Sequence, residues 1–295
     1  MLRNKSVTGK VVDAVIYLVL TVVALSCLVP IVHTVAVSFS DRAAAMANMV
    51  TFWPQRFTTS AYDTLLQDRQ YLTSFVNSLE RVLLGGSINF VLTVLMAFPL
   101  SKSSQHFPQK KYYLWYLVFS MLFSGGLIPS YILISRLGLR NTIWALVLPG
   151  AVPIFNVIVL MNFFKGLPDE LDEAARLDGA SPWVSLIRIF IPLAMPCIAT
   201  ITLFSVVGHW NAWFDGIMYI DRAAKQPLQS YLQQLTVEIR ETSTMSQEEL
   251  QRMAELSSKN FNAAKVFVSM VPVLIVYPFL QRYFVSGLVL GSVKG

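Results

Sequence analysis

Long apolar runs alternate with shorter polar segments along the whole chain. A helix needs about 20 apolar residues to cross the hydrocarbon core of a bilayer. Six runs meet or approach that length, and they cover about residues 11–37, 72–100, 112–135, 142–164, 192–220 and 261–285. The pattern predicts an all-α polytopic membrane protein in which residues 1–295 form a single transmembrane domain with six spans.

The first apolar run follows ten residues with three basic side chains and no acidic one. The run is longer than the roughly 7–15 residues of a signal-peptide core, and no clear cleavage site follows. We expect an uncleaved first span with a cytoplasmic N-terminus. Segment 101–111 has three lysines and no acid, which favours the same side. Six spans then place the tail, 286–295, in the cytoplasm and segments 38–71 and 221–260 outside.

Composition supports the membrane assignment and excludes other classes. Of the 295 residues, 55% are hydrophobic and 14% are charged, against about 25% charged in soluble domains. Cys27 and Cys197 both fall in apolar runs, so we expect neither a disulfide nor a metal site. The net charge of +6 is not gathered into a basic face for nucleic acid, and no Walker A pattern is present to bind a nucleotide.

The polar segment 165–191 has the pattern of two short helices joined by a turn. Acidic side chains crowd the first turn, where they suit the helix dipole: Asp169, Glu170, Asp172 and Glu173. Asp172 and Arg176 stand four residues apart on one helix face. Gly179 is placed to stop the first helix, and Pro192 begins the next span. A solvated connecting loop is the alternative, but a loop needs only polarity and not this arrangement.

Residues 173–180 read Glu-Ala-Ala-Arg-Leu-Asp-Gly-Ala, and Ile191-Pro192 follows. This stretch resembles the coupling-loop signature of ABC-importer permease subunits, in the extended form of the carbohydrate (maltose-permease) branch. Leu186 stands where that branch usually carries Phe. The run 123–129 and the segment 137–142 are similar to the subgroup that handles complex oligosaccharides, including alginate-type polysaccharides.

The resemblance implies a type I ABC importer fold with a cytoplasmic coupling helix. It implies a transport subunit, not an enzyme, that lies in the inner membrane beside a second permease. An ABC ATPase dimer would bind ATP and Mg, while this chain holds no cofactor. An extracytoplasmic binding protein would deliver an oligosaccharide or polysaccharide. By resemblance, Glu173 would form a salt bridge in the ATPase cleft, Gly179 would permit the turn, and small residues would let the ATPase approach. The implied coupling residues are Glu173, Ala174, Ala175, Asp178, Gly179, Ala180 and Pro192.

The fifth apolar run contains a polar and aromatic cluster that is a candidate for the translocation path. Its members are His209, Trp210, Asn211, Trp213 and Asp215. Aromatic faces stack on sugar rings, and Asn or Asp side chains bond hydroxyls. An interfacial aromatic belt with helix-to-helix hydrogen bonds is the alternative. Helix packing is the default expectation for the other polar residues of the spans, namely Glu80, Arg81, Asn89, Asn156 and Asn162.

Two polar segments are further candidates for partner contact. Within 221–260, Ser246–Glu249 has a capping-box pattern that opens a helix, and by resemblance this external segment reaches toward a sugar-binding protein. The tail containing Lys294 resembles one that enters the ATPase interface, or it is a frayed terminus.

Other transport and enzyme classes lack support in the sequence. An ion-gradient-driven secondary transporter is the alternative function, and it predicts an intramembrane acidic or His relay and an inverted repeat. A membrane enzyme would need paired carboxylates or a metal cluster within the spans. None of these features is evident.

Overall fold

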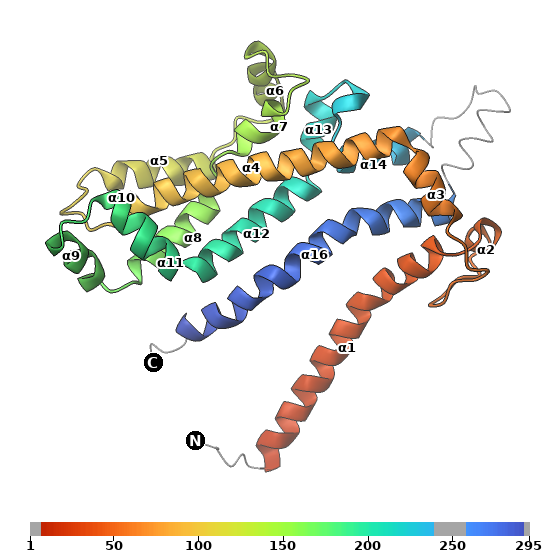
Figure 1. Ribbon diagram of the computed structural model, residues 1–295, viewed down its shortest axis with the longest axis horizontal. Helices are drawn as coiled ribbons and strands as arrows, with labels where there is room; N and C mark the ends of the chain where they lie inside the picture. Colours follow the sequence, from red (N-terminus) through yellow and green to blue (C-terminus); the bar gives the residue numbers. More distant parts are fainter. Residues whose placement is uncertain (1–6, 239–257, 292–295) are drawn as a thin grey trace. The chain divides into compact units, whose positions relative to one another are not determined.

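The computed structural model describes residues 7–238 and 258–291, and these residues form helices joined by turns and short loops, without a strand (Figure 1). Three helices in this part of the chain are long and apolar enough to cross a membrane, within Gly9–Ser38, Arg69–Ser101 and Lys259–Val276. Three bent helix pairs bring the total to six if each pair is one span. The predicted all-α, six-span class is therefore confirmed.

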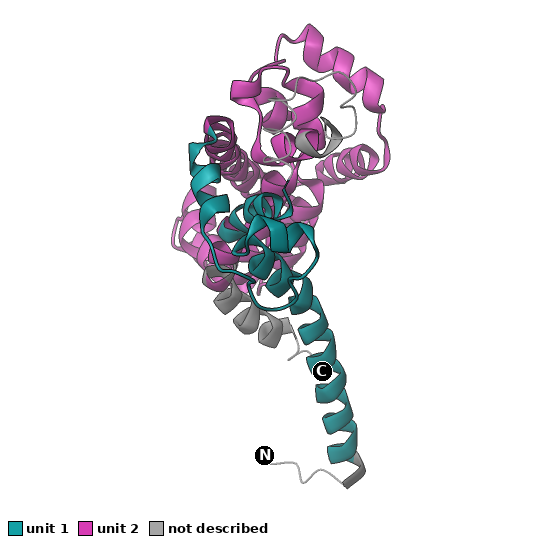
Figure 2. Ribbon diagram, turned by 90° about the vertical axis from the view of Figure 1, so that its right-hand side faces the viewer, with its two compact units in different colours: residues 1–68, 238–271 teal, residues 69–237, 272–295 magenta. Residues whose placement is uncertain are grey.

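The chain divides into two compact units, residues 1–68 with 238–271 and residues 69–237 with 272–295 (Figure 2). Within its described residues, the first unit has the helices α1 (Val7–Ser38), α2 (Arg42–Met46), α3 (Ser60–Gln67) and the beginning of α16 (Lys259–Gly291). Lys259 Nζ donates to Asn48 Oδ1 at 2.6 Å, and Asn260 donates to the carbonyl of Ser40. These bonds tie α16 to the polar segment that follows α1.

The second unit holds the end of α16 and all elements from α4 to α14. They are α4 (Arg69–Ser101), α5 (Lys110–Leu122), α6 (Leu127–Arg136), α7 (Trp144–Val147), η1 (Leu148–Gly150), α8 (Ile154–Lys165), α9 (Glu170–Leu177), α10 (Pro182–Ser185), η2 (Leu186–Phe190), α11 (Ile191–Leu193), α12 (Met195–Asn211), α13 (Phe214–Tyr219), η3 (Ala223–Lys225) and α14 (Leu228–Glu238). In this unit α4 packs along both α8 and α12 (Figure 1).

The spans of the second unit are interrupted where the sequence carries helix breakers. The chain bends by 112° between α5 and α6, where Gly126 has a φ of +89°. It bends by 44° between Trp144–Gly150 and α8, next to Pro153. It bends by 84° between Pro182–Leu193 and α12. The apolar run expected over 192–220 is also divided at its far end, because Ala212 is extended with a ψ of 121°.

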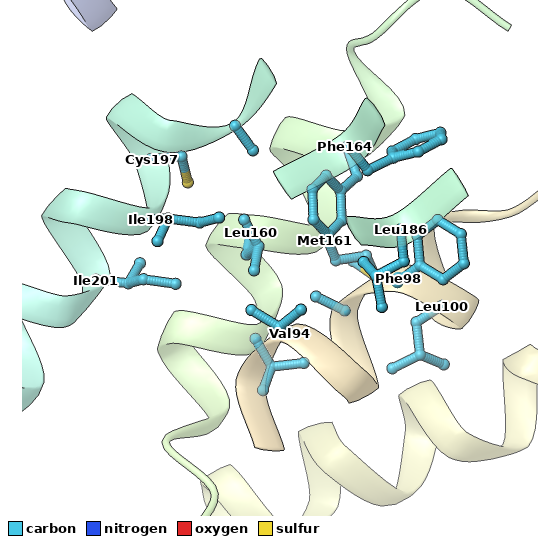
Figure 3. Packing of buried hydrophobic residues seen from close by; sticks show 14 of the residues in the cluster. Val94, Phe98, Leu100, Leu160, Met161, Phe164, Leu186, Cys197, Ile198 and Ile201 are labelled. Carbon is cyan, nitrogen blue, oxygen red and sulfur yellow. The ribbon is translucent and has the colours of Figure 1, made fainter. Parts of the chain in front are cut away.

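The apolar core of the second unit lies between α4, α8, η2 and α12 (Figure 3). Leu160 is fully buried, and Ile201 is 2% exposed. The rings of Phe98, Phe164 and Phe190 meet edge to face, with centroids 5.1–6.2 Å apart. This aromatic group joins the last turn of α4 to the segment that follows α9.

Some expected features lie outside the described residues. They are the capping box at Ser246–Glu249 and the last four residues, which include Lys294. Of the tail expected over 286–295, residues up to Gly291 continue the helix α16.

Candidate functional site

The short helix α9 is fastened to the end of α4 by an ion pair. Lys102 Nζ donates to Asp172 Oδ1 at 2.6 Å, although 70 residues separate the two. Arg176 Nη2 lies 2.9 Å from Asp172 Oδ2, so the pair predicted at this helical spacing is confirmed. Asp172 thus receives one cation from its own helix and one from the end of a span.

Lys102 is enclosed on several sides. Its side chain is only 15% exposed, and Nζ lies 4.2 Å from the ring centroid of Phe98 and 4.0 Å from that of Phe190. The pKa of Lys102 is lowered, chiefly by burial, although the hydrogen bond and charge of Asp172 raise it. Burial raises the pKa of Asp172, but the hydrogen bond and charge of Lys102, joined by Arg176, outweigh burial and lower it. Two rings and a carboxylate therefore fix the ammonium group against α9.

The faces of α9 differ in exposure. Glu173 and Ala174 are exposed, and Leu177 is 89% exposed. Ala175 is only 5% exposed, because it lies on the side of the helix that packs against this chain. Of the two alanines expected at a close-approach surface, Ala174 is thus exposed and Ala175 is buried. Leu177, which the sequence pattern did not single out, is exposed on the same helix.

The turn after α9 has the geometry that its glycine predicts. Gly179 has a φ of +73°, in the left-handed region. Its N–H donates to the carbonyl of Arg176 at 3.0 Å, and the N–H of Ala180 donates to that of Ala175 at 2.9 Å. Asp178 is exposed at the end of the helix. Pro192 lies farther along the chain, exposed in α11 just before the 84° bend.

A second candidate site is a pocket of about 440 Å³ in the second unit, with both polar and apolar lining residues. It is lined by α4, α7, η1, α8, α12 and α13. Its lining residues are Arg81, Asn89, Ala145, Leu146, Pro149, Gly150, Pro153, Asn156, Phe204, Ser205, Gly208, His209, Asp215 and Tyr219. Its volume falls in the range of about 300–1,000 Å³ that is usual for small-molecule sites.

The charged side of this pocket is the ion pair between Arg81 of α4 and Asp215 of α13. The contact is bidentate, with Nη1 3.0 Å from Oδ1 and Nη2 bonded to Oδ2. Arg81 also donates to the carbonyls of Ala212 and Leu146, at 3.2 and 3.4 Å. Its guanidinium therefore meets backbone carbonyls that the interrupted helices leave open.

Neutral polar groups, beside apolar residues, line other parts of the pocket. His209 Nε2 lies 2.6 Å from Asn89 Oδ1, and Asn89 Nδ2 donates to the carbonyl of Gly150 at 2.7 Å. Asn156 donates to Ser205 Oγ and to the carbonyl of Ile201, each at 3.2 Å. These bonds join α4, η1, α8 and α12 around one cavity.

The predicted translocation cluster is only partly brought together. His209 and Asp215 line the pocket. Trp210 is 3% exposed and packs edge to face on Phe75. Asn211 is exposed at the end of α12, and Trp213 is 42% exposed and packs on Phe214. Trp210, Asn211 and Trp213 are not among the residues that line the pocket.

The pocket also contains residues to which the sequence pattern assigned only a packing role or no role. Arg81, Asn89 and Asn156 do join helices, but all three line the cavity. Their polarity within apolar runs is a signal that could have selected them. Phe204 and Tyr219 carry no comparable signal, because aromatic residues are common in such runs.

Among the described residues, no group of three or more His, Cys, Asp or Glu is arranged to hold a metal ion. Cys27 and Cys197 are both free thiols.

No protein-family model matches the chain. The chain is 38% identical to protein LplC of Bacillus subtilis over 287 residues, which cover 97% of this chain and 96% of the relative. It is 35% identical to the polygalacturonan/rhamnogalacturonan transport system permease protein YtcP of the same organism, over 97% of this chain and 99% of the relative. A solved chain from a bacterial ABC transporter involved in import of the acidic polysaccharide alginate matches with a TM-score of 0.84 and 30% identity, over 95% of this chain and 99% of that one.

The expected family is thus confirmed at two levels, by sequence over nearly the whole length and by fold. The chain belongs to the sugar-transport permeases of ABC transporters and has their six-span, all-α membrane fold.

Proposed function

We propose that this chain is a permease subunit of an ATP-driven importer that takes up oligosaccharides derived from acidic polysaccharides. The substrate class is supported by two of its relatives, one named for polygalacturonan and rhamnogalacturonan and one from an alginate importer. Each of these polymers contains uronic acids, so their fragments carry carboxylates.

The observation that carries the proposed mechanism is the attachment of α9 to α4 through Lys102 and Asp172. The opposite face of α9 presents Glu173, Ala174 and Leu177 to solvent. A helix held firmly on one face and exposed on the other can transmit a force applied by a partner. Closure of an ABC ATPase dimer on α9 would therefore move α4, the span that also carries Arg81.

Glu173 is the residue that we assign to the ATPase contact. Glu173 and Leu177 stand one turn apart on the same face, so a charged and an apolar contact lie side by side. A charge-assisted bond from Glu173 would contribute about 1.5–3 kcal/mol, compared with about 0.3–1 kcal/mol for a helix-dipole charge. The turn at Gly179 and Ala180 sets the length of the docked helix.

The assembly that this mechanism requires contains two permeases, an ABC ATPase dimer and an extracytoplasmic binding protein. ATP and Mg bind the ATPase, so this chain needs no catalytic residues of its own. We assign the chain to the inner membrane with both termini in the cytoplasm, which places α9 and the lysine-rich segment 101–111 on the ATPase side. Segments 38–71 and 221–260 then face the binding protein.

The alternative of an ion-gradient-driven transporter is disfavoured by the ABC-permease relatives. It is also disfavoured by the local chemistry, because Asp215, the acid of the predicted pathway cluster, is paired with Arg81.

Affinity purification of the tagged chain in mild detergent, followed by mass spectrometry, tests the proposal. We expect recovery of a second permease and an ABC ATPase. Glu173→Lys should reach the membrane and keep the second permease but lose the ATPase. Asp63→Lys is the matched control, because Asp63 is an exposed acidic residue in the first turn of α3, another eight-residue helix.

Recovery of the wild-type chain alone, stable and monodisperse, would overturn the importer assembly. Normal ATPase recovery and uptake with Glu173→Lys would overturn the role of α9 while leaving the assembly intact.

A further inference from the structure

The pocket of the second unit combines three features that suit an acidic sugar. Arg81 supplies a cation, Asn156 and His209 supply groups that bond hydroxyls, and Phe204 supplies an aromatic face. The Phe204 side chain is open to contact, since the residue is 48% exposed. Polar groups placed within membrane spans are costly, and they usually face a cavity that a substrate or ion enters.

Arg81 has donor capacity that its present contacts do not use. A guanidinium has five N–H donors. The two terminal nitrogens bond Asp215 and two backbone carbonyls, but Nε is buried and has no hydrogen-bond partner among the described residues. The carbonyl of Leu146 is a distant acceptor at 3.4 Å. The arginine is thus held in place without being fully satisfied.

The two halves of the ion pair differ in access. The Arg81 side chain is 3% exposed, while that of Asp215 is 28% exposed. Asp215 also accepts from the N–H of Gly216 at 2.9 Å, so its carboxylate keeps one bond if Arg81 takes another partner. The guanidinium is the fixed member of the pair, and the carboxylate is the member that can be exchanged.

We propose that Arg81 binds the carboxylate of a uronosyl residue in the pocket, and that Asp215 is an internal carboxylate that occupies Arg81 until substrate displaces it. This inference rests on the proposed function, which supplies an acidic oligosaccharide. A carboxylate of the sugar reproduces the bidentate geometry that Asp215 now makes with the guanidinium. A neutral sugar offers no such group and cannot replace Asp215.

This exchange explains why Asp215 lies beside Arg81, although Arg81 would bind the carboxylate of an acidic substrate. The Arg81 side chain is only 3% exposed, and an unpaired guanidinium that is so buried is strongly unfavourable. Asp215 compensates that charge in the empty state. A ligand must therefore compete with Asp215 for Arg81. Only a ligand with its own carboxylate can do so, which gives selectivity for acidic over neutral sugars.

The pair of Arg140 and Asp221 in the same unit provides a matched control. Arg140 Nη2 lies 2.7 Å from Asp221 Oδ2, but their side chains are 37% and 56% exposed. Neither residue is among those lining the pocket. Exchange at this pair should not distinguish acidic from neutral substrates.

The test measures uptake by cells that express the complete transporter. The probes are trigalacturonide and trimannuronide, each compared with its carboxyl-reduced, neutral form. Arg81→Gln should lower the acidic-over-neutral ratio of kcat/KM by about tenfold or more, as expected for loss of one charge-assisted hydrogen bond. Asp215→Asn should lower the KM for the acidic probe, because the competing carboxylate is gone. Arg140→Gln and Asp221→Asn should leave the ratio unchanged.

The two variants of the buried pair thus shift acidic uptake in opposite directions, which a purely structural pair does not do. The inference fails if Asp215→Asn lowers uptake of acidic and neutral probes alike, or if the wild type prefers the neutral forms. Those results leave the importer assignment standing. If a wild-type transporter that has assembled with its ATPase takes up no oligosaccharide, the proposed function itself fails, and this inference fails with it.

Discussion

Gly85 of α4 lies so close to His209 of α12 that a Cβ on residue 85 would be 2.5 Å from His209 Nε2. The imidazole therefore packs directly on the backbone of α4. Asn89 lies one turn further along the same face, and its Oδ1 accepts a 2.6 Å hydrogen bond from His209 Nε2. Close approach at one glycine thus places the histidine where it joins the polar wall of the pocket.

Gly85→Ala should disturb this contact. Because the added methyl group meets a ring in a packed helix pair, we expect a loss of about 1–3 kcal/mol in stability. Thermal unfolding of the purified transporter and sugar uptake measure the effect. Gly86→Ala is the control, since a Cβ there has no neighbour within 4 Å. Equal behaviour of the two variants would show that the contact at Gly85 is not important.

Lys102→Met should uncouple ATP hydrolysis from transport. The substitution keeps an apolar side chain between Phe98 and Phe190 but leaves Asp172 without its partner from α4. We expect a membrane-inserted chain with reduced uptake and a loss of about 1.5–3 kcal/mol from the missing charged bond. Lys102→Arg, which keeps the cation and can stack on rings, should restore part of the uptake.

A double-mutant cycle with Asp172→Asn separates this pair from indirect effects. If Lys102 and Asp172 act through each other, the effect of the double variant should be smaller than the sum of the two single effects. Lys111→Met, at an exposed lysine of α5, should leave uptake unchanged. Additive losses, or normal uptake by Lys102→Met, would contradict the coupling role of the pair.

Gly179→Val should impair the α9 turn through backbone strain alone. A Cβ on residue 179 meets nothing within 4 Å, so there is no clash. The φ of +73° costs a residue with a side chain about 1–2 kcal/mol, and a β-branched one the most. Asparagine tolerates this region, so Gly179→Asn should retain more ATPase binding and uptake than Gly179→Val. The measurement is ATPase co-purification with each variant, and the reverse order would contradict a role for the turn conformation.

Local features could be predicted from the sequence because they depend on neighbours within a few residues. The Asp172–Arg176 pair follows from helical spacing, and the end of α9 follows from Gly179. The number of spans follows from the apolar runs, and the break between α5 and α6 follows from the glycines and the proline near it.

Long-range pairing could not be predicted in the same way. Lys102 bonds Asp172, which lies 70 residues away in the sequence, and Arg81 bonds Asp215, which lies 134 residues away. Each pair is brought together by the packing of helices that are far apart in the sequence, which no local pattern encodes. The same limit affected the aromatic cluster: the helix is broken at Ala212, and Tyr219 lines the cavity while Trp213 is not among its lining residues.

Asp172→Asn should also change the pH at which Lys102 loses its proton. In the wild type, burial lowers the pKa of Lys102, and the Asp172 carboxylate raises it part of the way back. Removing that carboxylate leaves burial and the charge of Arg176, which lower the pKa, opposed only by the smaller effect of Asp169, so the pKa of Lys102 falls. The neutral, reactive amine should therefore form at a lower pH in the variant. Acetylation of Lys102 as a function of pH, read by mass spectrometry, measures this shift, with Lys111 in the same sample as the internal control. A shift to higher pH, or none, would mean that Asp172 does not hold the Lys102 ammonium.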